Sequence, residues 1–391
     1  MVRPYSLLIG YNYATGRGKL GIIRSVENLV GWGSLIIFGM FLNGRRMIHV
    51  KLPDELARAP RRLPFYLAME EHLARNFSGE YFFMWQVAPT VIFGRNQIID
   101  AEVNLDYCRR EGIDTCRRKS GGGCVFADMN NIMFSHITTC RSVATTFTDF
   151  TSKVARMLCQ LGLDACTTGR NDILIGDRKV SGYAFYHIPV AGADGARSRA
   201  VVHGTMLHDT DMERMTAALT PSVVKLKAKG VESVRAHVTT IKEHSPISLD
   251  DFKRFTVDTL CDGEMTLTAD DVAEIERIAA PYYEPEWIYG RRRGASAVHY
   301  GPRRVEGAGE FVFDLEKTAG EPPHLVSLDL KGDFFLTGDL DGTLLRPLSG
   351  VPLDRPSLTH ALADVDVGAT IAGLTTETFI EMLLEASEMH K

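Results

Sequence analysis

Residues 117–126 read Arg-Arg-Lys-Ser-Gly-Gly-Gly-Cys-Val-Phe, so that three consecutive glycines stand between a basic run and an apolar one. Three adjacent glycines cost backbone entropy and add no packing. They suit a loop whose backbone N–H groups must come close to an anion. The two arginines suit the same ligand, because a guanidinium binds phosphate or carboxylate through two parallel hydrogen bonds. The stretch therefore predicts an anion-binding loop, although a flexible surface turn would explain the glycines alone equally well.

A second stretch, residues 169–184, reads Gly-Arg-Asn-Asp-Ile-Leu-Ile-Gly-Asp-Arg-Lys-Val-Ser-Gly-Tyr-Ala. The Gly-Asp pair between apolar runs is a hairpin signal. It predicts one strand over residues 173–175 and a second strand that begins at Lys179. A glycine inside a strand marks a place where another group approaches the backbone closely, and Gly182 is such a position. A lone lysine in a hairpin is usually a solvated charge, but here it accompanies a candidate phosphate loop.

Together these stretches resemble the lipoate–protein ligase A family, within the wider biotin and lipoate ligase fold. The family's glycine motif is matched at residues 117–128 and again at Asn131, and its Gly-Arg-Asn-Asp and Lys-Val-Ser-Gly motif at residues 169–172 and 179–184. Three further motifs follow the family pattern: Gly-Arg-Asn-Gln at 94–97, His-Gly-Thr-Met-Leu at 203–207, and a nucleotide-covering loop at 225–235. Five motifs in the family's order cover most of the chain from about residue 63.

Two positions depart from the family pattern. The family's usual histidine before Asp128 is Ala127 here, and its usual glycine before Asn131 is Asn130. Asparagine tolerates a left-handed backbone better than most residues, so we expect the turn to survive. The alanine puts in doubt a role for an imidazole beside the phosphates.

The fold class expected from pattern and resemblance is α/β, layered in the α+β manner. It comprises a biotin/lipoate ligase-type catalytic domain with mixed sheets and flanking helices, and a small C-terminal α+β accessory domain. The local patterns predict helices over residues 63–73, 147–161 (stopped by Gly162) and 376–384, and strands over residues 81–85, 90–93, 311–315 and 325–330. We expect the strands at 81–85 and 90–93 to pair with each other around residues 87–89.

Three segments are expected along the chain. Residues 1–46 are interpreted as a poorly ordered N-terminal extension, whose apolar run at 29–42 is too short and too rich in glycine for a membrane span. Residues 47–280 form the catalytic lipoate- and ATP-binding domain. Residues 281–391 contain a linking strap at 281–287 and the accessory domain. Three arginines at 291–293 are interpreted as a solvated surface cluster.

Composition agrees with a globular enzyme. The chain has 391 residues, of which 45% are hydrophobic and 24% charged, and a net charge of −5, which argues against a general nucleic-acid binder. Its seven cysteines include no Cys-x-x-Cys pair. An odd number of unpaired-looking thiols favours a reducing compartment, so we expect a cytoplasmic protein. We expect a monomer that has no stable membrane association.

The resemblance implies a two-step ligation. The carboxylate of lipoate attacks the α-phosphate of ATP to give lipoyl-AMP and pyrophosphate. A lysine amine of an acceptor lipoyl domain then attacks the mixed anhydride and releases AMP. Expected acceptors are the lipoyl domains of 2-oxoacid dehydrogenase E2 subunits and the glycine cleavage H protein, and Mg²⁺ is expected with ATP. The sequence does not decide between lipoate and octanoate.

The resemblance also suggests the residues of the site. The catalytic residue is Lys179, which bridges the lipoyl carboxylate and the α-phosphate. The ATP-binding residues are Arg118, Gly123, Cys124, Val125, Phe126, Asn171, Asp172 and Lys179, with Arg118 on the phosphates and Asn171 on the adenylate. The lipoate-binding residues are Lys179, Arg118, Gly122, His203 and Gly204. Asp172 is expected to hold the metal or to orient the attacking lysine amine. An apolar slot near Trp85 and Phe93 is expected to take the acyl tail.

Three other functions remain open. An ATP-independent octanoyl- or lipoyl-transferase would pass through a cysteine thioester at Cys166 or Cys124. We interpret both as buried structural thiols, since no histidine is adjacent in the sequence to activate either one. The second alternative is a non-catalytic relative that binds lipoyl domains, and the third is a biotin ligase.

Overall fold

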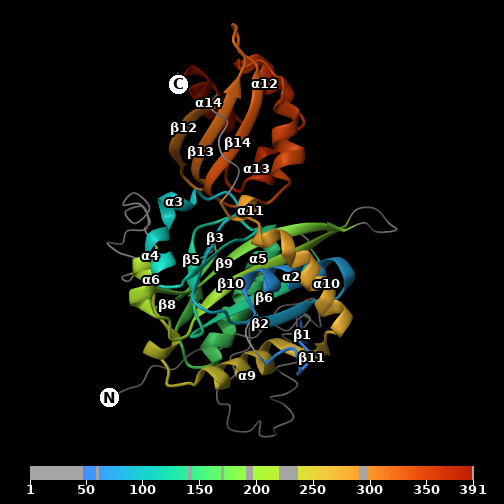
Figure 1. Ribbon diagram of the computed structural model, residues 1–391, viewed down its shortest axis with the longest axis vertical. Coiled ribbons are helices and arrows are strands. Elements are labelled where there is room, and N and C mark those ends of the chain that lie inside the picture. Colours follow the sequence, from blue (N-terminus) through green and yellow to red (C-terminus); the bar gives the residue numbers. More distant parts are fainter. Residues whose placement is uncertain are drawn as a thin grey trace, which may run out of the picture. The chain divides into compact units, whose positions relative to one another are not determined.

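The computed structural model describes residues 47–58, 61–139, 143–168, 171–190, 197–219, 237–289 and 297–389. The expectations for residues 1–46, 225–235 and 291–293, and for Gly169 and Arg170, lie outside these ranges. Within the described ranges the mixed α/β architecture is confirmed: the strands form three sheets, and helices flank them (Figure 1).

The largest sheet has eight strands, in the order β11-β1-β2-β6-β10-β9-β8-β7. Strand β1 runs parallel to both of its neighbours, β11 and β2, and the remaining pairs are antiparallel. The strands are β1 (Met47–Lys51), β2 (Tyr81–Trp85), β6 (Asn131–Thr139), β7 (Ala165–Thr167), β8 (Asp172–Ile175), β9 (Arg178–Val190), β10 (Arg197–Leu207) and β11 (Cys261–Thr266). The predicted hairpin is confirmed as β8 and β9, joined at Gly176, whose φ of 60° a glycine adopts without strain.

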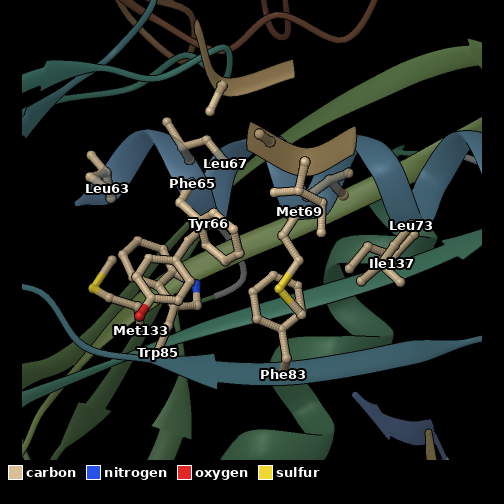
Figure 2. Packing of buried hydrophobic residues seen from close by; sticks show 14 of the residues in the cluster. Leu63, Phe65, Tyr66, Leu67, Met69, Leu73, Phe83, Trp85, Met133 and Ile137 are labelled. Carbon is tan, nitrogen blue, oxygen red and sulfur yellow. The ribbon is translucent and has the colours of Figure 1, made fainter. Parts of the chain in front are cut away.

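Helices cover both faces of this sheet (Figure 1). Helix α2 (Leu63–Asn76) and α10 (Ala269–Ala279) share one hydrophobic cluster with the sheet, while α5 (Val143–Gln160) and α9 (Leu249–Leu260) share a second one. Figure 2 shows α2 lying over β2 and β6, with Tyr66 above Trp85 and Met69 beside Phe83. The rings of Tyr66 and Trp85 stack with centroids 4.9 Å apart. The predicted helices at 63–73 and 147–161 are therefore confirmed as α2 and α5.

A smaller sheet carries the glycine stretch. Its order is β4-β3-β5, with β3 (Thr90–Phe93) parallel to β4 (Asp114–Arg117) and antiparallel to β5 (Val125–Ala127). The predicted pairing of strands 81–85 and 90–93 is wrong, because β2 pairs with β1 and β6 in the large sheet. Sequence proximity favours a hairpin, but pairing to distant strands buries both faces of β2.

The C-terminal part is an antiparallel sheet with its own hydrophobic cluster. Its strands are β12 (Val298–Val305), β13 (Gly309–Lys317) and β14 (Leu325–Phe334), and its helices are α12 (Arg355–Ala361), α13 (Val367–Thr370) and α14 (Thr376–Glu388). The predicted strands and final helix of this part are confirmed. A domain boundary near residue 280 stays a prediction.

Short helices complete the described chain. They are α3 (Ile99–Glu102), α4 (Leu105–Arg110), α6 (Met212–Ala218), η1 (Ile241–Glu243), η2 (Ala280–Tyr283), α11 (Pro285–Tyr289), η3 (Leu340–Leu345) and η4 (Arg346–Leu348). The expected strap at 281–287 is thus helical, and Tyr282 is buried in the cluster beneath α2. Across the described ranges, no helix combines the length and the hydrophobicity that crossing a bilayer requires.

Candidate functional site

The glycine stretch forms a tight loop between β4 and β5. Gly122 has a φ of 85°, a conformation that favours glycine. A Cβ on Gly94 would lie 2.1 Å from the Gly122 carbonyl oxygen, so the backbone of this loop contacts the backbone that follows β3. The Gly122 N–H donates to the Phe334 carbonyl of the C-terminal part at 3.1 Å. The loop therefore packs against two other backbone segments, and its residues 120–122 are buried, unlike an exposed surface turn.

Arg118 shapes this loop from inside. Its guanidinium donates to the carbonyls of Ile92, Gly121 and Gly123, at 3.2, 2.7 and 2.8 Å, and its Nε donates to Ser120 Oγ at 2.9 Å. Burial lowers the pKa of Arg118 to about 10, which still leaves the guanidinium charged at neutral pH. In this structure the side chain therefore holds the loop carbonyls, and its expected contact with phosphate stays a prediction.

The two neighbours of Arg118 fix the loop to other elements. Arg117 donates to backbone carbonyls on both sides of the loop, those of Gly94, Arg95, Gln97, Trp287 and Ile288. Lys119 pairs with the buried Glu71 of α2. Burial alone would raise the pKa of the Glu71 carboxyl, but Lys119 and Arg75 outweigh it and the pKa is lowered. Charged side chains thus set the position of the loop.

Lys179 lies at the start of β9, and its side chain reaches Asp172 of β8, the cross-strand partner of Gly182. Its Nζ is 2.7 Å from Asp172 Oδ1, and the two side chains are 19% and 16% exposed. A Cβ on Gly182 would lie 2.4 Å from the same Nζ, so the missing side chain makes room for the lysine. The close approach predicted at Gly182 is confirmed, and the approaching group is Lys179. The pair offers a partly shielded cation whose counter-ion is already in place.

His203 joins the glycine loop to the main sheet. Its Nε2 is 2.6 Å from Ser120 Oγ, and it faces Ala184 across the β9–β10 ladder. The Lys179 ammonium and Asp172 lie beside Gly182, which is two residues before Ala184, or about 7 Å along a strand. The Lys179–Asp172 pair therefore lies on the same stretch of the β9–β10 ladder as His203, which contacts the glycine loop.

Several expected residues have structural partners. Asn171 clamps the hairpin, donating from Nδ2 to the Tyr183 carbonyl at 3.0 Å. Gly204 is packed tightly, since a Cβ there would lie 2.5 Å from the Gly182 carbonyl oxygen. Gly123, Cys124 and Val125 are half-buried, whereas Phe126 is buried in β5. Their roles with nucleotide or lipoate stay predictions.

The expected acyl slot is not assembled as the sequence suggested. Trp85 lies in the cluster beneath α2, and Phe93 belongs to a separate cluster with β5, α3 and α6. Ala127, at the family's histidine position, is fully buried in the cluster of Trp85. A side chain at position 127 therefore faces the core of the protein.

Cysteine and carboxylate positions bear on a thioester route and on a metal site. Cys166 is exposed, which corrects the expectation of a buried thiol, because it lies on the short strand β7 at the edge of the main sheet. Cys124 is half-buried and lies 3.1 Å from Gln97 Oε1. The described residues contain no group of three or more His, Cys, Asp or Glu side chains placed to hold a metal ion.

Sequence reasoning missed Glu70 and the part played by Ser120. Glu70 is fully buried and accepts hydrogen bonds from His203 Nδ1 at 2.9 Å, from Tyr186 at 3.1 Å and from Ser135. The available signal was a carboxylate in the middle of the apolar helix pattern at 63–73. Burying a charge is costly unless it is hydrogen-bonded, so such a position indicates a built polar network.

The chain is similar to known proteins in sequence and in fold. Residues 63–261 match the family model of the lipoyl protein ligase A/B catalytic domain. The chain is 33% identical over 315 residues to lipoate–protein ligase 1 of Staphylococcus aureus strain Mu50, covering 77% of this chain and 90% of that protein.

Two solved structures are also similar. One is a bi-partite lipoate protein ligase from Thermoplasma acidophilum, described with its E2 lipoyl domain, at 25% identity and a TM-score of 0.54; the match covers 64% of this chain and all of that one. The other is lipoate–protein ligase A bound with ATP, at 24% identity and a TM-score of 0.52, covering 62% of this chain and 99% of that one. The likeness to the ATP-bound ligase shows a shared fold.

Proposed function

Because the chain belongs to the lipoate–protein ligase family, we propose that its site performs ATP-dependent activation of lipoate followed by lipoyl transfer to a lysine of an acceptor domain. The observation that carries the proposal is the placement of one shielded cation, Lys179, on the sheet that Ser120 and His203 tie to an ordered glycine loop. Both steps gather negative charge on oxygen atoms, which preorganised cations and N–H groups stabilise.

In the first step a carboxylate oxygen of lipoate attacks the α-phosphorus of ATP, and the bond to the pyrophosphate oxygen breaks. Two anions must meet, so a cation between them lowers their repulsion. Lys179 serves this role by exchanging its contact with Asp172 for the carboxylate and the α-phosphate. The glycine loop, Gly122 to Phe126, lies along the nucleotide, and Arg118 keeps its carbonyls turned away from the anion.

In the second step the acceptor lysine amine attacks the acyl carbon of lipoyl-AMP, and the bond to the AMP oxygen breaks. The amine loses a proton as the amide forms. We assign the orientation of that amine to Asp172, because its carboxylate neighbours Lys179. The acceptors proposed are E2 lipoyl domains and the glycine cleavage H protein, and the ligase acts as a monomer.

Mg²⁺ fits this site as a companion of ATP. The ion is usually held by one or two protein carboxylates together with substrate phosphates. Asp172 is the carboxylate that would hold it, next to the Lys179 ammonium. When bound, the ion neutralises phosphate charge.

The direct test is pyrophosphate release with ATP and lipoate, repeated with an apo lipoyl domain added. We expect pyrophosphate from ATP and lipoate alone, and a lipoylated domain in the second reaction. Biotin in place of lipoate is expected to give no pyrophosphate. Transfer of an acyl group without ATP would contradict the proposal.

A cysteine variant separates the ligase from the thioester route. Cys166 is exposed at an edge strand, so Cys166→Ala is expected to change ATP-dependent lipoylation by less than about twofold, as surface substitutions usually do. The measurement is lipoylation of the apo domain, with Cys159→Ala, another exposed thiol, as the control. Loss of activity only in the Cys166 variant would favour a covalent cysteine intermediate.

A further inference from the structure

A continuous hydrogen-bonded chain runs through the interior from β2 to the glycine loop. Trp85 Nε1 donates to Ser135 Oγ at 2.9 Å, and Ser135 donates to Glu70. Glu70 also bonds to His203 Nδ1 at 2.9 Å, and His203 Nε2 is 2.6 Å from Ser120 Oγ. Arg118 Nε donates to Ser120 Oγ at 2.9 Å, which completes the chain.

The donors of this chain assign one direction to its bonds. The Trp85 indole and the Arg118 guanidinium at the two ends can only donate. Ser120 accepts from Arg118. The Glu70 carboxylate accepts from His203 Nδ1–H, which in a neutral imidazole leaves Nε2 as the acceptor for the Ser120 hydroxyl hydrogen. Every bond thus points toward the Glu70 carboxylate, which accepts on both oxygens.

The chain is dry. Glu70 and Ser120 are fully buried, and His203 and Arg118 are each 5% exposed. In such an environment hydrogen bonds strengthen one another, and a donor that loses its acceptor pays the full cost of desolvation. Breaking any member should therefore disturb its neighbours.

We propose that Glu70, His203 and Ser120 are positioning residues that act in series to hold Arg118, and through Arg118 the glycine loop. Arg118 bonds the carbonyls of Gly121 and Gly123, so the acceptor at Glu70, on helix α2, determines the shape of a loop 50 residues later in the chain. The role in catalysis rests on the proposed ligase function, whereas the control of loop shape does not.

The first test measures amide hydrogen exchange of the peptide covering residues 117–126. Glu70→Gln places an NH₂ group among three donors, so we expect exchange in this peptide to become about ten- to a hundredfold faster, as loss of a hydrogen bond to a charged group implies. Thr256→Val is the matched control, because it removes an equally buried hydroxyl that bonds within α9. Unchanged exchange in folded Glu70→Gln would overturn the proposal.

The second test uses the serial arrangement. Ser120→Ala should accelerate amide exchange of residues 117–126 about as much as Glu70→Gln does, whereas Ser120→Thr, which keeps the hydroxyl, should exchange nearly as slowly as the wild type. The double variant Glu70→Gln/Ser120→Ala should exchange no faster than the faster of the two single variants. If the double variant accelerated exchange by the product of the two single effects, the proposal would be overturned, because independent structural defects combine in that way. Thermal unfolding of each variant verifies the folded state.

Pyrophosphate release is measured on the same proteins. If the wild-type protein released no pyrophosphate but the variants showed the expected exchange rates, the ligase function would be contradicted and the control of loop shape by Glu70 would stand. If the wild-type protein were active and the variants exchanged like Thr256→Val, only the control of loop shape would be contradicted.

Discussion

Lys179→Ala is expected to lower the rate of pyrophosphate release from ATP and lipoate by about 10²- to 10³-fold, the loss typical when one preorganised electrostatic contact of a transition state is removed. The lysine is a partly shielded cation at the proposed meeting point of two anions. It also holds Asp172, so the variant leaves that carboxylate to repel the incoming phosphate. The measurement is the initial rate of pyrophosphate release at saturating ATP.

A matched control lies next to it in the chain. Arg178 carries the same charge, but pairs with Glu243 at 2.9 Å and takes no part in the proposed site. Arg178→Ala is expected to keep nearly all activity. Lys179→Arg keeps the charge with a different geometry, and an intermediate rate is expected. Equal rates for Lys179→Ala and Arg178→Ala would contradict the assignment of Lys179.

The sequence predicted local elements better than their partners. The helix at 63–73 and the hairpin around Gly176 are encoded by periodicity and a turn, both of which act over a few residues. The predicted partner of β2 was wrong, because the partners of a strand depend on which distant segments cover the two faces of the sheet. Short-range patterns contain no such information.

The same limit applied to the site. Arg118 and Lys179 could be selected as candidates because charge near glycine is a local signal, and their roles stay predictions. The contacts of Arg118 with loop carbonyls, and of Ser120 with His203, join positions that only the folded sheet brings together. Glu70 illustrates the difference: its position in an apolar helix was visible, but its acceptor role depends on donors from three other elements, β6, β9 and β10.

Gly182→Ala is expected to reduce pyrophosphate release about as much as Lys179→Ala, by about 10²-fold or more, although it changes neither charge nor any polar group. The new Cβ would lie 2.4 Å from Lys179 Nζ and 2.5 Å from Cε, so the ammonium must leave its place beside Asp172. A displacement of about 1 Å near reacting atoms can cost about 10²-fold in rate.

The fold should survive this change, because the nearest atoms belong to the far end of a flexible side chain. Gly204→Ala differs, since its Cβ would lie 2.5 Å from the Gly182 carbonyl oxygen, which is backbone and cannot move aside. We therefore expect the midpoint temperature of thermal unfolding to fall clearly for Gly204→Ala and little for Gly182→Ala. Gly263→Ala, whose nearest neighbour is 3.9 Å away, is the control for both measurements. An active Gly182→Ala protein would show that Lys179 need not occupy its observed position for adenylation. The bridging cation would then be another residue.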